Sequence, residues 1–90
     1  MNVVITKQFS KDVEKIDEKK IIEHIISTIE FIKTSESIEI LTNIKKMQGF
    51  MSFYRIKIGN YRLGFELNKD LGEVVLKRFL HRKDIYRYFP

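Results

Sequence analysis

The stretch YRIKIGNYRLGFE, residues 54–66, limits the possible fold more than any other part of the chain. Apolar and polar residues alternate on both sides of a Gly-Asn pair, which is typical of two antiparallel strands joined by a two-residue turn. This register places Lys57 directly opposite Arg62 on the neighbouring strand. Because facing cations normally destabilise a sheet, the hairpin indicates that an anion binds between them.

The rest of the chain predicts two helices before the hairpin and one strand after it. Isoleucines recur at i, i+3, i+4 and i+7 along KKIIEHIISTIEFIK, which is the period of an amphipathic helix. We expect strands at Asn2–Thr6, Phe53–Ile58, Tyr61–Asn68 and Glu73–Leu80, helices at Phe9–Ile16 and from the N-cap Asp17 to Lys33, and a short C-terminal helix within HRKDIYRYFP. Ser35–Gln48 shows no clear pattern and is interpreted as a connection back to the sheet.

This order of elements predicts an α+β fold. Strands segregated from helices favour a helical hairpin packed on one face of a mainly antiparallel sheet, here of four strands. Ninety residues suffice for one core but not for two, so residues 1–90 are expected to form a single domain. The residues expected to face the helices are Tyr54, Ile56, Ile58, Tyr61, Leu63 and Phe65. Those expected on the opposite, open face are Arg55, Lys57, Arg62, Gly64 and Glu66.

The open face predicts a phosphate site. Arginine supplies a fork of donors and lysine a mobile point charge, so a group of such cations suits phosphate. Gly64 leaves the floor of the site without a side chain, and a strand glycine often marks the close approach of a ligand. In the alternative interpretation, Lys57 and Arg62 extend into solvent and Glu66 neutralises one of them.

Positive charge is concentrated in the second half of the chain. The formal net charge is +5, made up of −2 over residues 1–44 and +7 over residues 45–90. This asymmetry favours a nucleic acid as partner, although a basic surface also serves solubility alone. No apolar run approaches the roughly 18 residues that span a bilayer, and the first residues lack a secretory signal, so we expect a cytoplasmic protein with no membrane partner.

The segment HRKDIY adds a second cluster near the C-terminus. On a helical turn Arg82 and Tyr86 are i, i+4 neighbours, and over the open face they would offer a cation and a ring on which a base could stack. His81 is a reserve acid or base, although a lone histidine beside a core strand is more often structural. The two separated histidines and scattered carboxylates show no metal-ligand spacing, so we expect neither a metal nor another cofactor.

These motifs, in this order, resemble the RelE/ParE superfamily of toxins from toxin–antitoxin pairs, most closely its RelE-like members. The resemblance covers essentially the whole chain, and its most specific parts are YRIKIGNYRL and HRKDIY. It implies a RelE-like fold and a metal-independent ribonuclease that cuts messenger RNA in the ribosomal A site. In that reaction the 2′-hydroxyl attacks the adjacent phosphate and leaves a cyclic phosphate and a 5′-hydroxyl. It also implies an acidic, helix-rich RelB-like antitoxin, in a complex that could be a heterotetramer.

The resemblance also assigns a role to each matching residue. Arg62 would hold the scissile phosphate and stabilise its developing charge, and Lys57 would act as base. Arg82 would stabilise the leaving 5′-oxygen, and Tyr86 would stack on a base and fix the in-line geometry. The residues expected to bind RNA are Arg55, Lys45, Lys46 and His81. Since Arg55 stands where some members of the family carry lysine, a mechanism with two lysine bases does not apply.

Two other functions fit the same sequence. Toxins of the ParE branch share the fold and inhibit DNA gyrase through protein contacts, without nuclease chemistry. A relative that binds nucleic acid without cleaving it is the third candidate. The combination of Lys57, Arg62, Arg82 and Tyr86 favours the ribonuclease, because a gyrase inhibitor does not need these side chains on one face.

Overall fold

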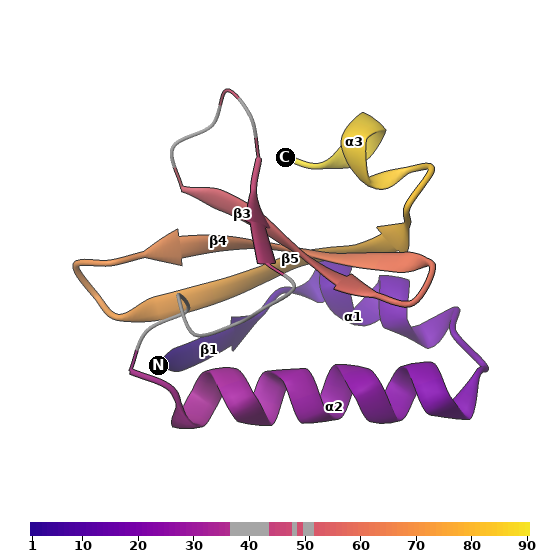
Figure 1. Ribbon diagram of the computed structural model, residues 1–90, viewed down its shortest axis with the longest axis horizontal. Helices are drawn as coiled ribbons and strands as arrows, with labels where there is room; N and C mark the ends of the chain where they lie inside the picture. The colour runs from indigo at the N-terminus through magenta and orange to yellow at the C-terminus, as the bar shows by residue number, and fades with distance from the viewer. Residues whose placement is uncertain (37–43, 48, 50–51) are drawn as a thin grey trace.

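A single five-stranded sheet organises the part of the chain that the structure describes. The structure is a computed structural model, and it describes residues 1–36, 44–47, 49 and 52–90. The elements are β1 (Asn2–Ile5), α1 (Lys7–Glu14), α2 (Lys19–Thr34), β2 (Ile44–Lys46), β3 (Phe53–Ile58), β4 (Tyr61–Asn68), β5 (Glu73–His81) and α3 (Ile85–Tyr88). The strand order is β1-β5-β4-β3-β2, with β1 parallel to β5 and the other pairs antiparallel. In Figure 1, α2 lies below the sheet and α3 above it.

The predicted α+β fold is confirmed, but the sheet has one more strand than the four expected. The additional strand, β2, pairs with β3 at the edge of the sheet. It has only three residues, and two of them are lysines, so the sequence carries no alternation that could reveal it. The remainder of the expected connection lies partly outside the described residues, at 37–43 and 48.

The two long helices begin and end within two residues of their expected bounds. Helix α1 starts before Phe9 because Thr6 is its N-cap, and the Thr6 hydroxyl accepts a hydrogen bond from the Phe9 amide at 3.2 Å. The N-cap of α2 is Glu18 and not the expected Asp17, and it makes no side-chain capping bond. Within the described residues, none of the helices combines the length and the apolar character that crossing a bilayer requires.

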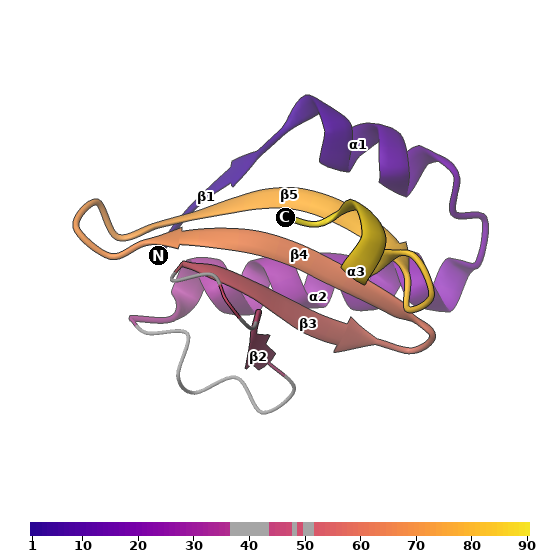
Figure 2. The ribbon, with the colours of Figure 1, turned by 90° about the horizontal axis from the view of Figure 1, so that it is seen from above.

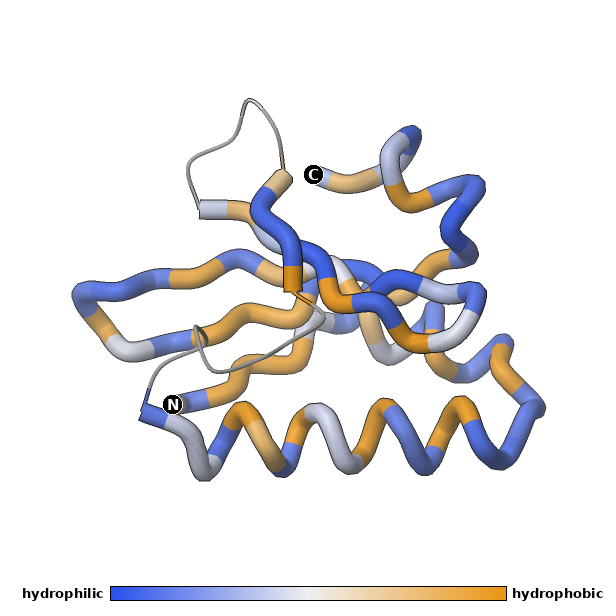
Figure 3. Tube along the Cα trace, in the orientation of Figure 1, coloured by the Kyte–Doolittle hydropathy of each residue, from blue (hydrophilic) through white to orange (hydrophobic). Residues whose placement is uncertain are grey.

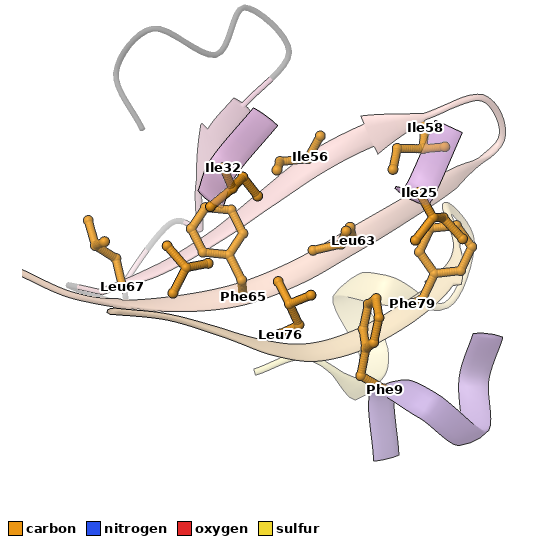
Figure 4. Packing of buried hydrophobic residues seen from close by; sticks show 11 residues of the cluster. Phe9, Ile25, Ile32, Ile56, Ile58, Leu63, Phe65, Leu67, Leu76 and Phe79 are labelled. Atoms are coloured by element: carbon orange, nitrogen blue, oxygen red, sulfur yellow. The ribbon is translucent and has the colours of Figure 1, made fainter. Parts of the chain in front are cut away.

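The hairpin has the predicted register, and this register sorts its side chains between the two faces. Its residues pair as Phe53–Glu66, Arg55–Gly64, Lys57–Arg62 and Ile58–Tyr61. Apolar side chains of the strands and of α2 meet below the sheet, where Ile32, Ile56 and Leu63 are fully buried (Figure 4). Figure 3 shows that apolar segments recur along the side of α2 nearest the sheet. Each such fully buried side chain contributes about 1.5–3 kcal/mol relative to an exposed one.

Helix α1 lies beside the edge of β5, beyond the end of β1 (Figure 2). Strand β1 pairs only as far as Leu76, so the later amides of β5 need other acceptors. The carboxylate of Asp12 accepts the Phe79 amide at 2.9 Å, and it also binds Arg78 Nε at 2.8 Å and Arg78 Nη2 at 3.2 Å. An ion pair between the buried Asp12 carboxylate and the partly exposed Arg78 thus joins α1 to the sheet.

The open face carries a small apolar cluster of its own. Met47, Ile85 and Phe89 are buried there, against Phe53 and Leu80. The ring of Phe89 lies so close to Gly64 that a Cβ atom on residue 64 would be 2.7 Å from Phe89 Cδ2. The expectation that a ligand approaches Gly64 is therefore wrong, because a ring from the same chain fills that space. This contact holds α3 above the sheet.

Candidate functional site

Cross-strand pairing gathers cations on the open face. Lys57 lies opposite Arg62, and Arg55 lies opposite Lys45 of β2 as well as Gly64. Directly opposed residues of an antiparallel pair project from the same face of the sheet. Three neighbouring strands therefore place Lys45, Arg55, Lys57 and Arg62 on one face.

Arg62 is the most enclosed of these cations. Its Nη1 donates to the carbonyl oxygens of Gly59 at 3.1 Å and Tyr61 at 2.8 Å, while its Nε is buried with no hydrogen-bond partner among the described residues. Burial lowers the pKa of Arg62, and the charges of Arg55 and Arg82 lower it further, against an opposing effect of Tyr86. Arginine still remains a cation at neutral pH, so these groups form a centre of positive charge that attracts an anion.

Tyr86 reaches this centre from α3. Its hydroxyl accepts a hydrogen bond from Arg55 Nε at 2.6 Å, and the guanidinium carbon of Arg55 is 6.0 Å from the centroid of the ring. The side chain is nevertheless 61% exposed, so its ring remains accessible to a ligand. The contact joins the middle of β3 to the C-terminal helix.

Arg82 lies just beyond the end of β5, where the chain turns toward α3. Its backbone amide donates to the carbonyl oxygen of Asn60 at 2.8 Å, which fixes this segment against the turn between β3 and β4. Its own side chain is exposed, and its charge acts on Arg62. The structure thus brings together Arg62, Arg82, Tyr86 and Arg55, which come from three separate parts of the sequence.

Two of the residues expected to bind RNA lie apart from this group. Lys46 is opposite Tyr54, whose ring stacks on Phe65 in the core, so Lys46 belongs to the helix-covered face. His81 is opposite Tyr61 on that same face, and its ring packs edge-on against Tyr61 with centroids 5.7 Å apart. Its Nδ1 accepts the Lys83 amide at 3.2 Å, so the histidine has a structural role at the end of β5.

Glu66 forms its ion pair with Lys77 and not with a cation of the hairpin. The Glu66 carboxylate forms an ion pair with Lys77 on the adjacent strand, at 3.5 Å. Within the described parts of the chain, no carboxylate contributes to the shift in the pKa of Arg62. Among the described residues there is also no group of three or more His, Cys, Asp or Glu side chains that could hold a metal ion.

Sequence reasoning missed two contacts that hold the surrounding elements in place, one at α1 and one next to α3. One is the Asp12–Arg78 pair. The sequence indicated it, because Asp12 follows Phe9 by three positions and so lies on the apolar stripe of α1. A charged residue at a core position implies a buried partner. The other is the contact of Phe89 with Gly64, which joins the last turn of the chain to β4 and has no local signature.

Comparison with known proteins identifies the family. A family model described as the ParE toxin of type II toxin–antitoxin system, parDE, matches residues 3–86. The chain belongs to this family. It is also 41% identical to Toxin RelE3 of Methanocaldococcus jannaschii, in an alignment of 91 positions that covers 100% of both chains. The toxin resemblance found in the sequence is therefore confirmed.

Solved structures of toxins share the fold. A chain of the RelB–RelE antitoxin–toxin complex from Methanococcus jannaschii is 38% identical and superposes with a TM-score of 0.81, with 97% of this chain and 99% of that chain covered. A chain of the archaeal RelE–RelB complex from Pyrococcus horikoshii OT3 gives a TM-score of 0.74 at 18% identity, with 90% and 93% covered. The second likeness, at this low identity, concerns the fold alone.

Proposed function

We propose that this protein is the toxin of a type II toxin–antitoxin pair and acts in the cytoplasm as a ribosome-dependent endoribonuclease on messenger RNA. The observation that carries the proposal is the grouping of Arg55, Lys57 and Arg62 on the open face of the sheet, where the Tyr86 hydroxyl bonds Arg55 and the charge of Arg82 acts on Arg62. A cationic centre beside an exposed aromatic ring suits a phosphate that is flanked by a base. The 41% identity to a protein named Toxin RelE3 supports the same function.

The proposed reaction is an internal transesterification at one phosphate of the message. The 2′-oxygen forms a bond to phosphorus while the bond from phosphorus to the 5′-oxygen breaks, which leaves a cyclic phosphate and a 5′-hydroxyl. Lys57 takes the proton of the attacking hydroxyl. Arg62 binds the non-bridging oxygens and stabilises the charge that develops on them. Arg82 stabilises the leaving 5′-oxygen, which takes a proton from water as it departs.

Tyr86 has a positioning role in this proposal. Its exposed ring stacks on a base next to the scissile phosphate, and the stack aligns the 2′-oxygen with the bond that breaks. Lys45 and Arg55 extend the positive charge along the open face, toward β2. Lys45 contributes to the attraction of RNA, whereas Lys46 and His81 lie on the other face and are left without a direct role.

We also propose a RelB-like antitoxin as partner, acidic and rich in helix. Two observations support it: the net charge of +7 over residues 45–90, and the similarity to a toxin chain crystallised in a complex with RelB. An acidic partner complements the basic open face and competes with RNA for it. Co-expression with a candidate antitoxin, selected as a small acidic protein from a neighbouring gene, followed by light scattering, tests the interaction and distinguishes a heterodimer from a heterotetramer.

The second candidate function is inhibition of DNA gyrase, because the matching family model is described by its ParE toxins. Two assays run in parallel separate the candidates. In reconstituted translation on a defined message, a ribonuclease produces cuts that appear only when ribosomes are present. The downstream fragments then accept phosphate from a kinase without prior phosphatase treatment, as free 5′-hydroxyls do. An intact message together with inhibited supercoiling would establish the gyrase function instead.

A further inference from the structure

Arg55 makes a contact that sets it apart from the other cations of the open face. Its Nε donates to the hydroxyl of Tyr86 at 2.6 Å, and its guanidinium lies 6.0 Å from the ring centroid. Arg55 is half-buried in the middle of β3, between β2 and β4, so its own backbone is held by pairing on both sides. A short hydrogen bond from a fixed strand is well suited to orient a mobile side chain.

Among the residues that the structure describes, few other contacts restrain the ring of Tyr86. Helix α3 has only four residues, and its N-cap Asp84 makes no side-chain capping bond. The helix is anchored through Ile85 and Phe89, which are buried on its other side, while the Tyr86 side chain is 61% exposed. An exposed aromatic side chain moves between rotamers unless a specific contact selects one. The hydroxyl bond to Arg55 is such a contact.

We infer that Arg55 is a positioning residue, whose guanidinium holds Tyr86 in the orientation in which the ring stacks on the base beside the scissile phosphate. The inference rests on the proposed function and adds to it a separate role for Arg55. Arg62 binds the reacting phosphate, Lys57 takes the proton of the attacking hydroxyl, and Arg55 acts on the reaction through Tyr86. Arginine suits this task better than lysine because its planar group offers Nε–H in a fixed direction while it lies near the ring.

A double-mutant cycle tests whether Arg55 acts through Tyr86. Arg55→Gln, Tyr86→Phe and the double variant are compared with wild type by single-turnover cleavage on programmed ribosomes, at saturating toxin so that binding does not contribute. Each single change removes the hydroxyl bond, and we expect each to slow cleavage about tenfold. If Arg55 acts through Tyr86, the double variant is also about tenfold slower. A loss near a hundredfold would mean that the two residues act independently, and would overturn the inference.

The salt dependence of RNA affinity separates two roles for Arg55. Loss of a residue that contacts an RNA phosphate changes this dependence, whereas loss of a residue that only positions Tyr86 does not. Removal of one phosphate contact flattens the plot of log affinity against log salt by about 0.7 for a single strand. We expect Arg55→Gln to leave this slope unchanged, and a flatter slope would contradict the inference. Lys69→Gln, in the exposed turn between β4 and β5, is the control and should cleave like wild type. Failure of the wild type itself to cleave would overturn the proposed function and this inference together.

Discussion

At the scale of single residues, the carboxylate of Asp12 is the polar group on which the packing of α1 depends most. It is buried, and it accepts hydrogen bonds from the Phe79 amide, from both donors of Arg78 and from Gln8 Nε2 at 3.1 Å. Burial alone would raise the pKa of Asp12, but these bonds to Arg78, Phe79 and Gln8 outweigh it and hold the pKa below its ordinary value of 3.8. The ionised form is therefore the one that the fold requires.

We predict that Asp12→Asn lowers the free energy of unfolding by about 1–3 kcal/mol, because it removes the buried carboxylate that binds Arg78 and the Phe79 amide. The measurement is the midpoint of urea unfolding at neutral pH. Asp70→Asn is the matched control, since Asp70 is exposed in the turn between β4 and β5, and it should change stability by less than about 0.5 kcal/mol. Equal effects of the two substitutions would show that the ion pair does not stabilise the fold.

The same group predicts how stability depends on acid. Because the pKa of Asp12 is lower in the folded chain than in the unfolded one, its contribution is present above about pH 4 and is lost as the pH falls through the lowered value. The difference in unfolding free energy between wild type and Asp12→Asn should therefore shrink below pH 4. Urea unfolding at a series of pH values from 7 to 3 measures it. A difference that stays constant down to pH 3 would contradict the assignment.

At the scale of elements, the position of α3 depends on the contact between Gly64 and Phe89. A methyl group at Gly64 would be 2.7 Å from one ring carbon of Phe89 and 2.8 Å from another, so Gly64→Ala must displace the ring or the helix. Since α3 carries Tyr86, we predict that this substitution slows messenger RNA cleavage at least tenfold while it lowers stability by about 1–3 kcal/mol.

A second substitution separates this steric effect from other consequences of an added methyl group. Phe89→Ala removes the ring, so Gly64→Ala should cost less than about 0.5 kcal/mol in that background. The four unfolding free energies of the cycle give the coupling between the two sites. If Gly64→Ala costs the same with and without the ring, then Phe89 is not the reason for the glycine.

The elements also show what local sequence can and cannot predict. The hairpin could be predicted to the residue, because alternation and a Gly-Asn turn allow only one register in which apolar side chains share a face. Strand β2 could not, since three residues are too few for a period. The sequence marked Gly64 as a place of close approach but not the approaching group, because Phe89 comes from a distant part of the chain.

At the scale of the whole molecule, the sheet lies between the main hydrophobic core and the residues of the proposed catalytic site. The face covered by α2 holds the main core, and the opposite face holds the cations together with α3 (Figure 2). The charge asymmetry between the two halves of the sequence predicted a basic surface. The grouping of Arg62, Arg82 and Tyr86 depends in addition on how the chain folds back after β5, which the HRKDIY segment indicated only on the condition that it lies over the open face.

The most direct test of the account compares Arg62→Ala with Lys69→Ala in reconstituted translation, where primer extension maps the 5′ ends of the message. Arg62 lies at the cationic centre and Lys69 is an exposed cation in the turn between β4 and β5, so the two substitutions remove the same charge from different places. We predict ribosome-dependent cuts for wild type and Lys69→Ala, and a loss of at least a hundredfold for Arg62→Ala with its fold intact. Cleavage by Arg62→Ala at the wild-type rate would contradict the assignment of the open face as the catalytic site.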